Sequence, residues 1–455
     1  MKKSLLIVSA LSLISTSAMA TQARLLALGM NETDNEGMYH VSDARNMFLN
    51  PAYINLYNNQ AIFEWGSVGQ YANASTTLAS DATLNSSISP KAQGGVLTKQ
   101  GDFVYGLYFG NESNTSSLLR VAATSAFAAV NGFGGTLNSK MLATSDNQVD
   151  FFFGGGSDLK WAVNPVLTFG KNDSRKSKDS GISLRTGAIG SNWDAHLNVS
   201  LNSKSEANES VTVAATTANV AQEFKGKLGL HVGGSYVISG NNRAFGYVKH
   251  YGWEQTDSFA GYAATDAQAV PTGFGGNGLG GQRGTVKGDF TSYHLGWGSH
   301  TDVNTTDKLF YSLTAKKTDI NLKFSNKGEV RYIIIPVTVG YEAQATEWLT
   351  LRGSVVQNLW GQQDNKNVTN YTGATGTRLN RVAAGLISQI YGGTGKKTLA
   401  NSTAVNAGAT LTFGNLSVDG LIGTTSSTGA NSSTSKTGVL SFSNLETSVG
   451  ATYKF

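Results

Sequence analysis

The sequence contains no cysteine, only five prolines among 455 residues, and few charged residues, which make up 14% of the chain. Without cysteine the chain has no disulfide bonds, no thiolate metal ligands and no cysteine for lipid attachment. The chain also has no proline-rich stretch, no block of like charge and no helical repeat period that would mark a linker. We therefore expect one structural unit over most of the chain.

Long apolar runs are absent as well. Beyond the first twenty residues no 18 consecutive apolar residues occur, which excludes a transmembrane helix there. The start, "MKKSLLIVSALSLISTSAMA", has two lysines, a short apolar stretch and small residues at 18 and 20, the pattern of a secretory signal peptide over residues 1–20. Without Lys2 and Lys3 the net charge falls from +5 to +3, too small and dispersed to indicate a nucleic-acid partner.

Short segments of period-two alternation are what the sequence does have, for example "WDAHLNVSLN" at 193–202 and "AVNAGATLTFG" at 404–414. Strands of about 10 residues, apolar outward and polar inward, are typical of outer-membrane barrels, because every backbone group in hydrocarbon must be paired. We predict an all-β fold, an antiparallel transmembrane β-barrel or β-wall of about 16 strands (14–18) over residues 61–455. Residues 21–60 would form a lead-in or plug. A soluble β-sandwich or β-helix is the alternative.

Two segments show helical spacing instead. "RLNRVAAGLISQIYGG" places apolar residues three and four apart before a Gly-Gly stop, and residues 118–130 do the same before a glycine-rich stretch. We predict one or two short helices there, in a loop or in the lumen.

Two strands break the simple pattern. "RAFGYVKHYGW" puts Tyr251 and Trp253 at a strand end, which favours an aromatic girdle at the membrane interface, although Lys249 lies on the same face. "VRYIIIPVTVGY" has apolar residues on both faces at Ile333, Ile334 and Ile335. We expect these isoleucines to contact lipid or a neighbouring subunit. A bend at the following proline is the other explanation.

Catalytic and metal motifs are not found. The six histidines show no ligand spacing, and His196 and His231 lie on polar faces of separate strands. The glycine-rich stretches at 272–285 and 392–398 lack the spacing of a phosphate loop. We expect no catalytic residue, no metal site and no cofactor, and therefore no enzyme. A serine hydrolase on the barrel surface is the alternative, since serine is abundant.

The carboxyl terminus, "NLETSVGATYKF", alternates apolar and polar residues and ends in an aromatic residue. It resembles the terminal signature of Gram-negative outer-membrane proteins, which the barrel-insertion machinery reads. The resemblance implies that Tyr453 and Phe455 form a membrane-insertion signal. Replacing Phe455 by alanine is expected to lower the amount of folded protein in the membrane.

Near the amino terminus, "RNMFLNPAYIN" followed by "AIFEWG" resembles the PopA-like porin-like proteins of predatory bacteria. That resemblance implies an oligomeric β-wall around a chamber of lipid. The turn Asn50-Pro51-Ala52 also resembles FadL-like transporters of hydrophobic compounds. Pro51 fixes its own φ and holds Asn50 extended, so this is a rigid turn, and its apolar surroundings predict burial in the barrel or at its rim.

These observations predict a protein of the cell outer membrane, exported through the periplasm. The function that we expect is that of a major porin-like protein: envelope structure and passive permeation by a homo-oligomer that encloses lipid. The expected partners are outer-membrane lipids, further copies of the chain and the barrel-insertion machinery. The alternatives are a FadL-like channel for hydrophobic compounds, which needs a closed barrel, a plug and a lateral opening, a general diffusion porin, and an adhesin that acts through loops such as 255–284.

Overall fold

The computed structural model describes most of the chain beyond the signal segment. The residues described are 21–30, 36–66, 91–111, 147–173, 176–213, 216–260, 281–323, 327–366, 395–398, 403–425 and 445–455. The predicted signal peptide and both predicted helical segments lie outside these ranges. Among the described residues, no helix has the length and apolar character needed to span a membrane.

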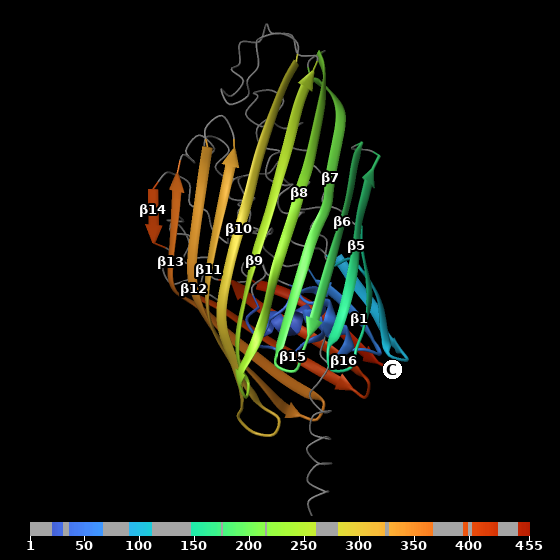
Figure 1. Cartoon of the computed structure of the whole chain (residues 1–455), viewed down its shortest axis with the longest axis vertical. Coiled ribbons are helices and arrows are strands. Elements are labelled where there is room, and N and C mark those ends of the chain that lie inside the picture. The colour runs from blue at the N-terminus through green and yellow to red at the C-terminus, as the bar shows by residue number, and fades with distance from the viewer. Residues whose placement is uncertain are drawn as a thin grey trace, which may run out of the picture.

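Antiparallel strands dominate this part of the chain (Figure 1). They are β1 (Gln60–Gly66), β2 (Lys91–Gln100), β3 (Phe103–Phe109), β4 (Asn147–Gly155), β5 (Lys160–Asn172), β6 (Ser177–Ile189), β7 (Trp193–Val213), β8 (Thr216–Ser239), β9 (Asn242–Ala260), β10 (Gly281–Asp302), β11 (Lys308–Lys323), β12 (Lys327–Thr346), β13 (Leu349–Lys366), β14 (Gly395–Thr398), β15 (Thr403–Phe413), β16 (Leu416–Thr425) and β17 (Leu445–Lys454).

The sheet closes on itself. β1 pairs with β2 on one side and with β17 on the other, with Gln60 opposite Lys454. β15 pairs with β13 at residues 349–357, and the four residues of β14 pair with β13 at residues 362–365. Sixteen strands therefore encircle the barrel in the described residues, and β14 is a short addition. The predicted antiparallel barrel of about 16 strands is confirmed, and it closes within one chain.

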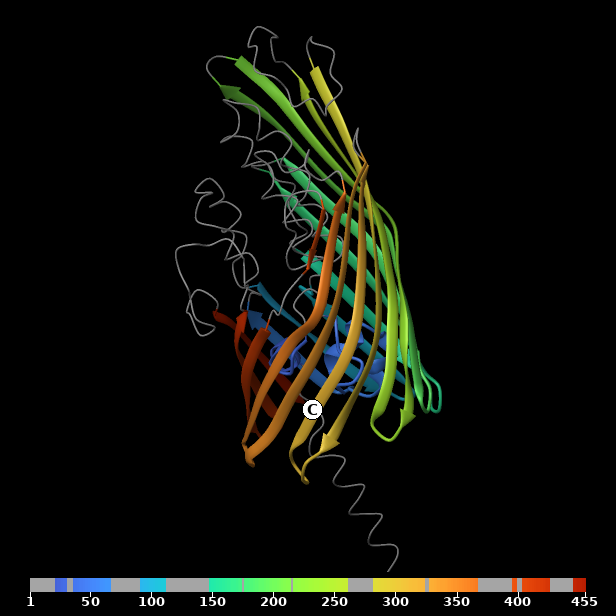
Figure 2. The ribbon, with the colours of Figure 1, turned by 90° about the vertical axis from the view of Figure 1, so that its left-hand side faces the viewer.

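The two ends of the barrel differ. Strands at one end are joined by short connections, such as 101–102, 240–241 and 347–348, and the carboxyl terminus lies at this end. At the other end β7 to β10, of 19 to 24 residues, extend far beyond β15 to β17, of 10 or 11, so one side of the barrel is tall (Figure 2). Short turns mark the periplasmic end of outer-membrane barrels. The outward face carries the apolar band expected of such a barrel, so the protein is an outer-membrane protein.

Side chains along β12 point alternately to the outward and the inward face of the barrel. Ile333 lies on the outward face and Ile334 on the inward face, where it is buried. The pairing of β12 with β13 shifts by one residue between Ile335 and Pro336, and the pairing with β11 is also interrupted beside this proline. Proline has no backbone N–H to donate to a neighbouring strand, so the interruption of strand pairing falls at Pro336.

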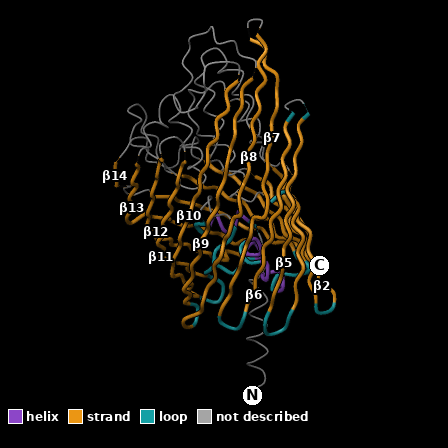
Figure 3. Tube along the Cα trace, turned by 45° about the horizontal axis from the view of Figure 1, so that its top comes forward, coloured by secondary structure: helices purple, strands orange, loops and turns teal. Residues whose placement is uncertain are grey.

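The segment before β1 lies inside the barrel (Figure 3). It contains the helix α2 (Gln22–Ala27) and the 3-10 helices η2 (Ala44–Phe48) and η3 (Pro51–Asn55). Side chains of Thr21, Asp43 and Asn50 cap the starts of these helices by accepting backbone N–H groups. Sequence reasoning placed a turn here and no helix, because each piece is too short to show a helical period.

Candidate lumen site

The amino-terminal segment, described at residues 21–30 and 36–57, crosses the lumen, and we call these residues the plug. At one end α2 packs against β13, β15, β16 and β17. At the other end η3 packs against β3 to β6, on the opposite side of the ring. Among the described residues its apolar side chains form three buried clusters with the barrel wall. One lies around Leu25 and Leu28 and includes Phe310 and Leu421, one lies around Phe48, and one joins Tyr39 and Leu49 to Phe245 and Tyr247. The plug therefore obstructs the lower lumen.

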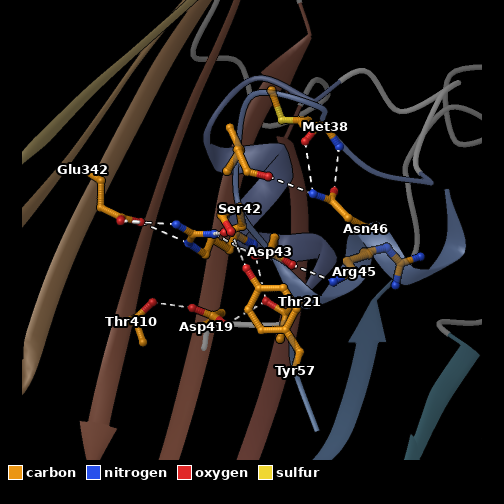
Figure 4. A network of polar contacts seen from close by, with 12 residues as sticks. Thr21, Met38, Ser42, Asp43, Arg45, Asn46, Tyr57, Glu342, Thr410 and Asp419 are labelled. Atoms are coloured by element: carbon orange, nitrogen blue, oxygen red, sulfur yellow. Dashed lines mark hydrogen bonds and ion pairs between the residues drawn. The ribbon is translucent and has the colours of Figure 1, made fainter. Parts of the chain in front are cut away.

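A buried ionic network fixes the α2 end of the plug (Figure 4). Arg24 donates from Nη1 to Asp43 Oδ2 at 2.7 Å and from Nε to Glu342 Oε2 of β12 at 3.1 Å. Arg352 of β13 pairs with the same Glu342 and, through Nη1, with Asp419 Oδ1 at 3.2 Å. Burial disfavours the charge on Arg24, but Glu342 and Asp43 together raise its pKa above the ordinary value. The guanidinium is therefore charged, and it ties two parts of the plug to the wall.

A second network fixes the middle of the plug. Arg45 forms a buried ion pair with Glu64 of β1, and Tyr108 of β3 donates to Glu64 Oε2 at 2.6 Å. The backbone N–H of Arg45 donates to Asp43 Oδ1 at 2.8 Å, which links the two networks. Buried pairs of this kind are weak sources of net stability, but removing one partner is costly because it leaves a buried charge behind. They specify where the plug sits.

The turn Asn50-Pro51-Ala52 begins η3 and lies in the lumen. Asn50 Oδ1 accepts from the N–H of Ala52 at 3.0 Å, while Nδ2 donates to the carbonyls of Ala188 and Ala195 at 3.3 and 3.2 Å. These carbonyls belong to β6 and β7, so the side chain joins the turn to the wall. Gly187 makes this approach possible, because a Cβ there would lie 1.9 Å from Asn50 Oδ1. The role of the motif is structural in this geometry.

Histidines line the contact between plug and wall. His196 of β7 and His231 of β8 lie side by side on the inward face, with their Nε2 atoms 3.3 Å apart. Glu36 of the plug pairs with His231 Nδ1 at 3.4 Å and with Lys249 Nζ of β9 at 3.3 Å. Burial acts to raise the pKa of Glu36, but Lys249 and His231 hold it below its ordinary value. Within the described residues no three ligating groups gather as a metal site would require.

Above the plug the inward face changes character. From the row of Tyr251 upward, its large described side chains on β8 to β12 are apolar and mostly buried, and we call this surface the apolar inner face: Phe224, Tyr251, Trp253, Phe290, Ile320 and Val330. Four of them are neighbours across strands, with Tyr251 opposite Phe290, Phe290 opposite Ile320, and Ile320 opposite Val330. The rings of Tyr251 and Phe290 stack with centroids 5.5 Å apart. Porin lumens are polar, so this surface needs another explanation.

The placement of Tyr251 and Trp253 corrects the expected interfacial girdle. Both residues face the lumen, and Trp253 is only 2% exposed. Glycines on neighbouring strands give these rings their room, since a Cβ at Gly288 would lie 2.4 Å from the Trp253 ring. The sequence signal that this face points inward is Lys249, because a lysine at that depth cannot face lipid.

The remaining predicted site residues lie apart from the lumen. Tyr453 and Phe455 are about half exposed on the outside at the periplasmic end, and the N–H of Phe455 donates to the carbonyl of Asn59 at 3.1 Å. Ile333 faces outward near Lys317, whereas Ile334 faces inward and is buried, opposite Lys316 of β11 and below the apolar inner face. The structure therefore does not bring the isoleucines together with the amino-terminal turn or with the carboxyl terminus.

No protein-family model matches the chain, and no curated protein matches it. Among solved structures it is similar to a FadL homologue of Pseudomonas aeruginosa, with 12% identity, 96% of this chain and 98% of that one covered, and a TM-score of 0.44. It is also similar to the monoaromatic hydrocarbon channel CymD, with 8% identity, 96% and 98% coverage and a TM-score of 0.39. The toluene transporter TbuX of Ralstonia pickettii gives 12% identity, 92% and 99% coverage and a TM-score of 0.34. These scores are too low to carry a function to this chain, and none of these structures is PopA-like.

Proposed function

We propose that this protein is an outer-membrane channel for hydrophobic compounds, which it takes up without catalysis. The observation that carries the proposal is the apolar inner face, a continuous inward row of Tyr251, Phe290, Ile320 and Val330 above the plug. Apolar side chains that face the lumen make no contact with membrane lipid, and they do not stabilise a water-filled lumen. Phe290, Ile320 and Val330 are only 1–3% exposed, so a solute has to part them to enter. An apolar solute that does so loses its contact with water, a gain of about 25 cal/mol for each Å² buried.

The plug argues against the porin-like function expected from sequence. A general diffusion porin needs an open, water-filled lumen with unpaired charges at its constriction. Here the lower lumen holds the plug, and the charges of Arg24, Arg45 and Glu36 are paired with wall residues. A closed barrel with an internal plug meets two of the three requirements of the hydrophobic channel, the third being a lateral opening. Enclosed lipid and a homo-oligomer stay predictions.

The test uses asymmetric vesicles with a lipopolysaccharide outer leaflet, because this leaflet slows the spontaneous passage of hydrophobic molecules. The probe is N-phenyl-1-naphthylamine, a dye that fluoresces when it reaches an apolar environment. We expect vesicles containing the protein to take up the dye faster than empty ones, and to show no osmotic swelling in arabinose. Swelling in arabinose with unchanged dye uptake would identify a diffusion porin and overturn the proposal.

A matched pair of variants connects the result to the apolar inner face. Phe290→Asn places a polar amide in the middle of the row and is expected to slow dye uptake, while Phe290→Leu keeps the surface apolar and is expected to retain most of it. Heat-modifiable mobility of the barrel in gels reports whether both variants fold. Equal uptake by two folded variants would show that the solute does not pass along this surface.

A further inference from the structure

A groove of about 530 Å³ lies on the outward face of the barrel across β8 to β12. Two small residues, Gly246 and Ala315, form its floor. Its sides are apolar and come from four strands: Val232, Val248, Leu295 and Ile333. Leu295 is 70% exposed, the most exposed of the large apolar side chains on the described strands. A groove with this lining has the character of a site for a hydrocarbon chain.

Cationic side chains stand at one rim of this groove. Lys317, which lines it, lies with Nζ 5.5 Å from the centre of the Tyr293 ring. Asp319 accepts from both Lys317 Nζ at 2.7 Å and Arg331 Nε at 2.8 Å.

Asp364 of β13 lies opposite Arg331, and Glu329, which pairs with Lys366, also acts on its charge. The site therefore offers a phosphate group hydrogen-bond donors rather than an excess of positive charge, because an ammonium has three N–H donors and a guanidinium five. The Lys317 and Arg331 side chains are 40% and 49% exposed, so both can donate to a further group.

The position of the cluster fits the headgroup level of the outer leaflet. Outward-facing positions on β12 are apolar from Tyr341 up to Ile333, and the next one is Arg331. On β11 the outward positions are apolar up to Ala315, and the next one is Lys317. The apolar stretch on β12 measures about 20 Å along the barrel axis, close to the hydrophobic height of such barrels. The short turns lie at the opposite end, so the cations stand at the extracellular edge.

We propose that this groove binds one anionic lipid of the outer leaflet, with an acyl chain over Gly246 and Ala315 and a headgroup phosphate on Lys317 and Arg331. A guanidinium presents two parallel donors to phosphate oxygens, and an ammonium adds a point charge beside it. The chain then covers a depression that the bilayer would otherwise have to fill. This site faces the membrane and is separate from the lumen, so it does not depend on the proposed channel function.

Native mass spectrometry of the folded protein tests the site. The protein is released from vesicles with equal amounts of dioleoylphosphatidylglycerol and dioleoylphosphatidylethanolamine, which share their acyl chains and differ in net charge. We expect one retained lipid per barrel, with the anionic lipid preferred by about fivefold, the effect of a net gain of about 1 kcal/mol from charge-assisted hydrogen bonds to its phosphate. Equal retention of the two lipids by the wild-type protein would overturn the proposal.

Three variants separate charge from shape. The double variant Lys317→Gln/Arg331→Gln is expected to abolish the preference for the anionic lipid, and Ala315→Leu, which fills the floor, is expected to reduce retention of both lipids. Lys287→Gln is the control, because Lys287 is also an exposed outward lysine in an ion pair, with Glu254 at 3.2 Å, but lies away from the groove. A double variant that keeps the preference, or an Ala315→Leu variant that keeps its lipid, contradicts the assignment. Dye uptake is expected to be unchanged in all three.

Discussion

The lower and upper halves of the lumen use opposite chemistry. The lower half is crossed by the plug and held by buried charged residues, such as Arg24, Arg45 and Arg352, each paired with carboxylates of the plug or wall. The upper half, starting one row above Lys249, presents aromatic and aliphatic side chains such as Phe290 and Ile320. Both halves are built on the same strands with the same alternation.

The two halves of the lumen therefore suit different tasks, holding the plug in position and binding solutes. Buried ion pairs are directional and costly to break, so they fix one arrangement of the plug. Apolar surfaces are non-directional and accept many shapes of solute. The lower half is therefore suited to hold a barrier in place, and the upper half to receive hydrophobic molecules of varied structure.

The largest expected effect comes from breaking the ion pairs that hold the plug in the lower half of the lumen. Arg24→Met leaves Asp43 without its guanidinium partner and removes one of the two cations of Glu342, which should weaken plug docking by about 3–5 kcal/mol. We expect raised ionic conductance in planar bilayers. Lys171→Met is the control, because its ion pair with Asp173 at 2.8 Å is exposed and worth about 0–1 kcal/mol. A variant with wild-type conductance would show that the network does not hold the barrier.

A smaller effect is expected from a change confined to the upper half. Gly288→Ala places a Cβ 2.4 Å from the Trp253 ring and displaces it, at a cost of about 1–3 kcal/mol. Dye uptake should fall while conductance stays at the wild-type level. Gly420→Ala is the control, since a Cβ there meets nothing within 4 Å. If Gly288→Ala changed conductance instead, the two halves would not act separately.

The smallest expected effect concerns pH. Both ring nitrogens of His40 in the plug are buried without a hydrogen-bond partner in the described structure. Burial, with His300, Arg243 and His294 nearby, lowers the pKa of His40 to about 4. A lowered histidine pKa means that the folded state resists protonation. The free energy of folding is therefore unaffected by His40 above about pH 6.5, and stability is lost as the pH falls from there towards 4.

Plug docking should therefore weaken by about 1–2 kcal/mol between pH 7 and pH 5. Conductance recorded across this range is expected to rise in the wild-type protein and to rise less in His40→Phe, which keeps a ring against Phe245. Parallel pH profiles for the two proteins would assign the dependence to other groups.

Much of the barrel could be predicted from the sequence, because period-two alternation is local. Strands such as 193–202 and 404–414 show it directly, and the strand number follows from counting them. The plug contacts could not be predicted, because Arg24 and Glu342 are 318 positions apart and meet only through closure of the barrel. The direction of a face was also ambiguous where both faces are apolar, and so Tyr251 and Trp253 were assigned to the wrong side.

Crystals soaked with 4-bromotoluene provide the most direct test of the account, since the anomalous signal of bromine locates the compound without interpretation of weak density. The account predicts a bromine peak in the upper lumen, in contact with the rings of Phe290 or Tyr251 and above the plug. Bromine peaks only on the outward face of the barrel, with an empty upper lumen, would contradict it.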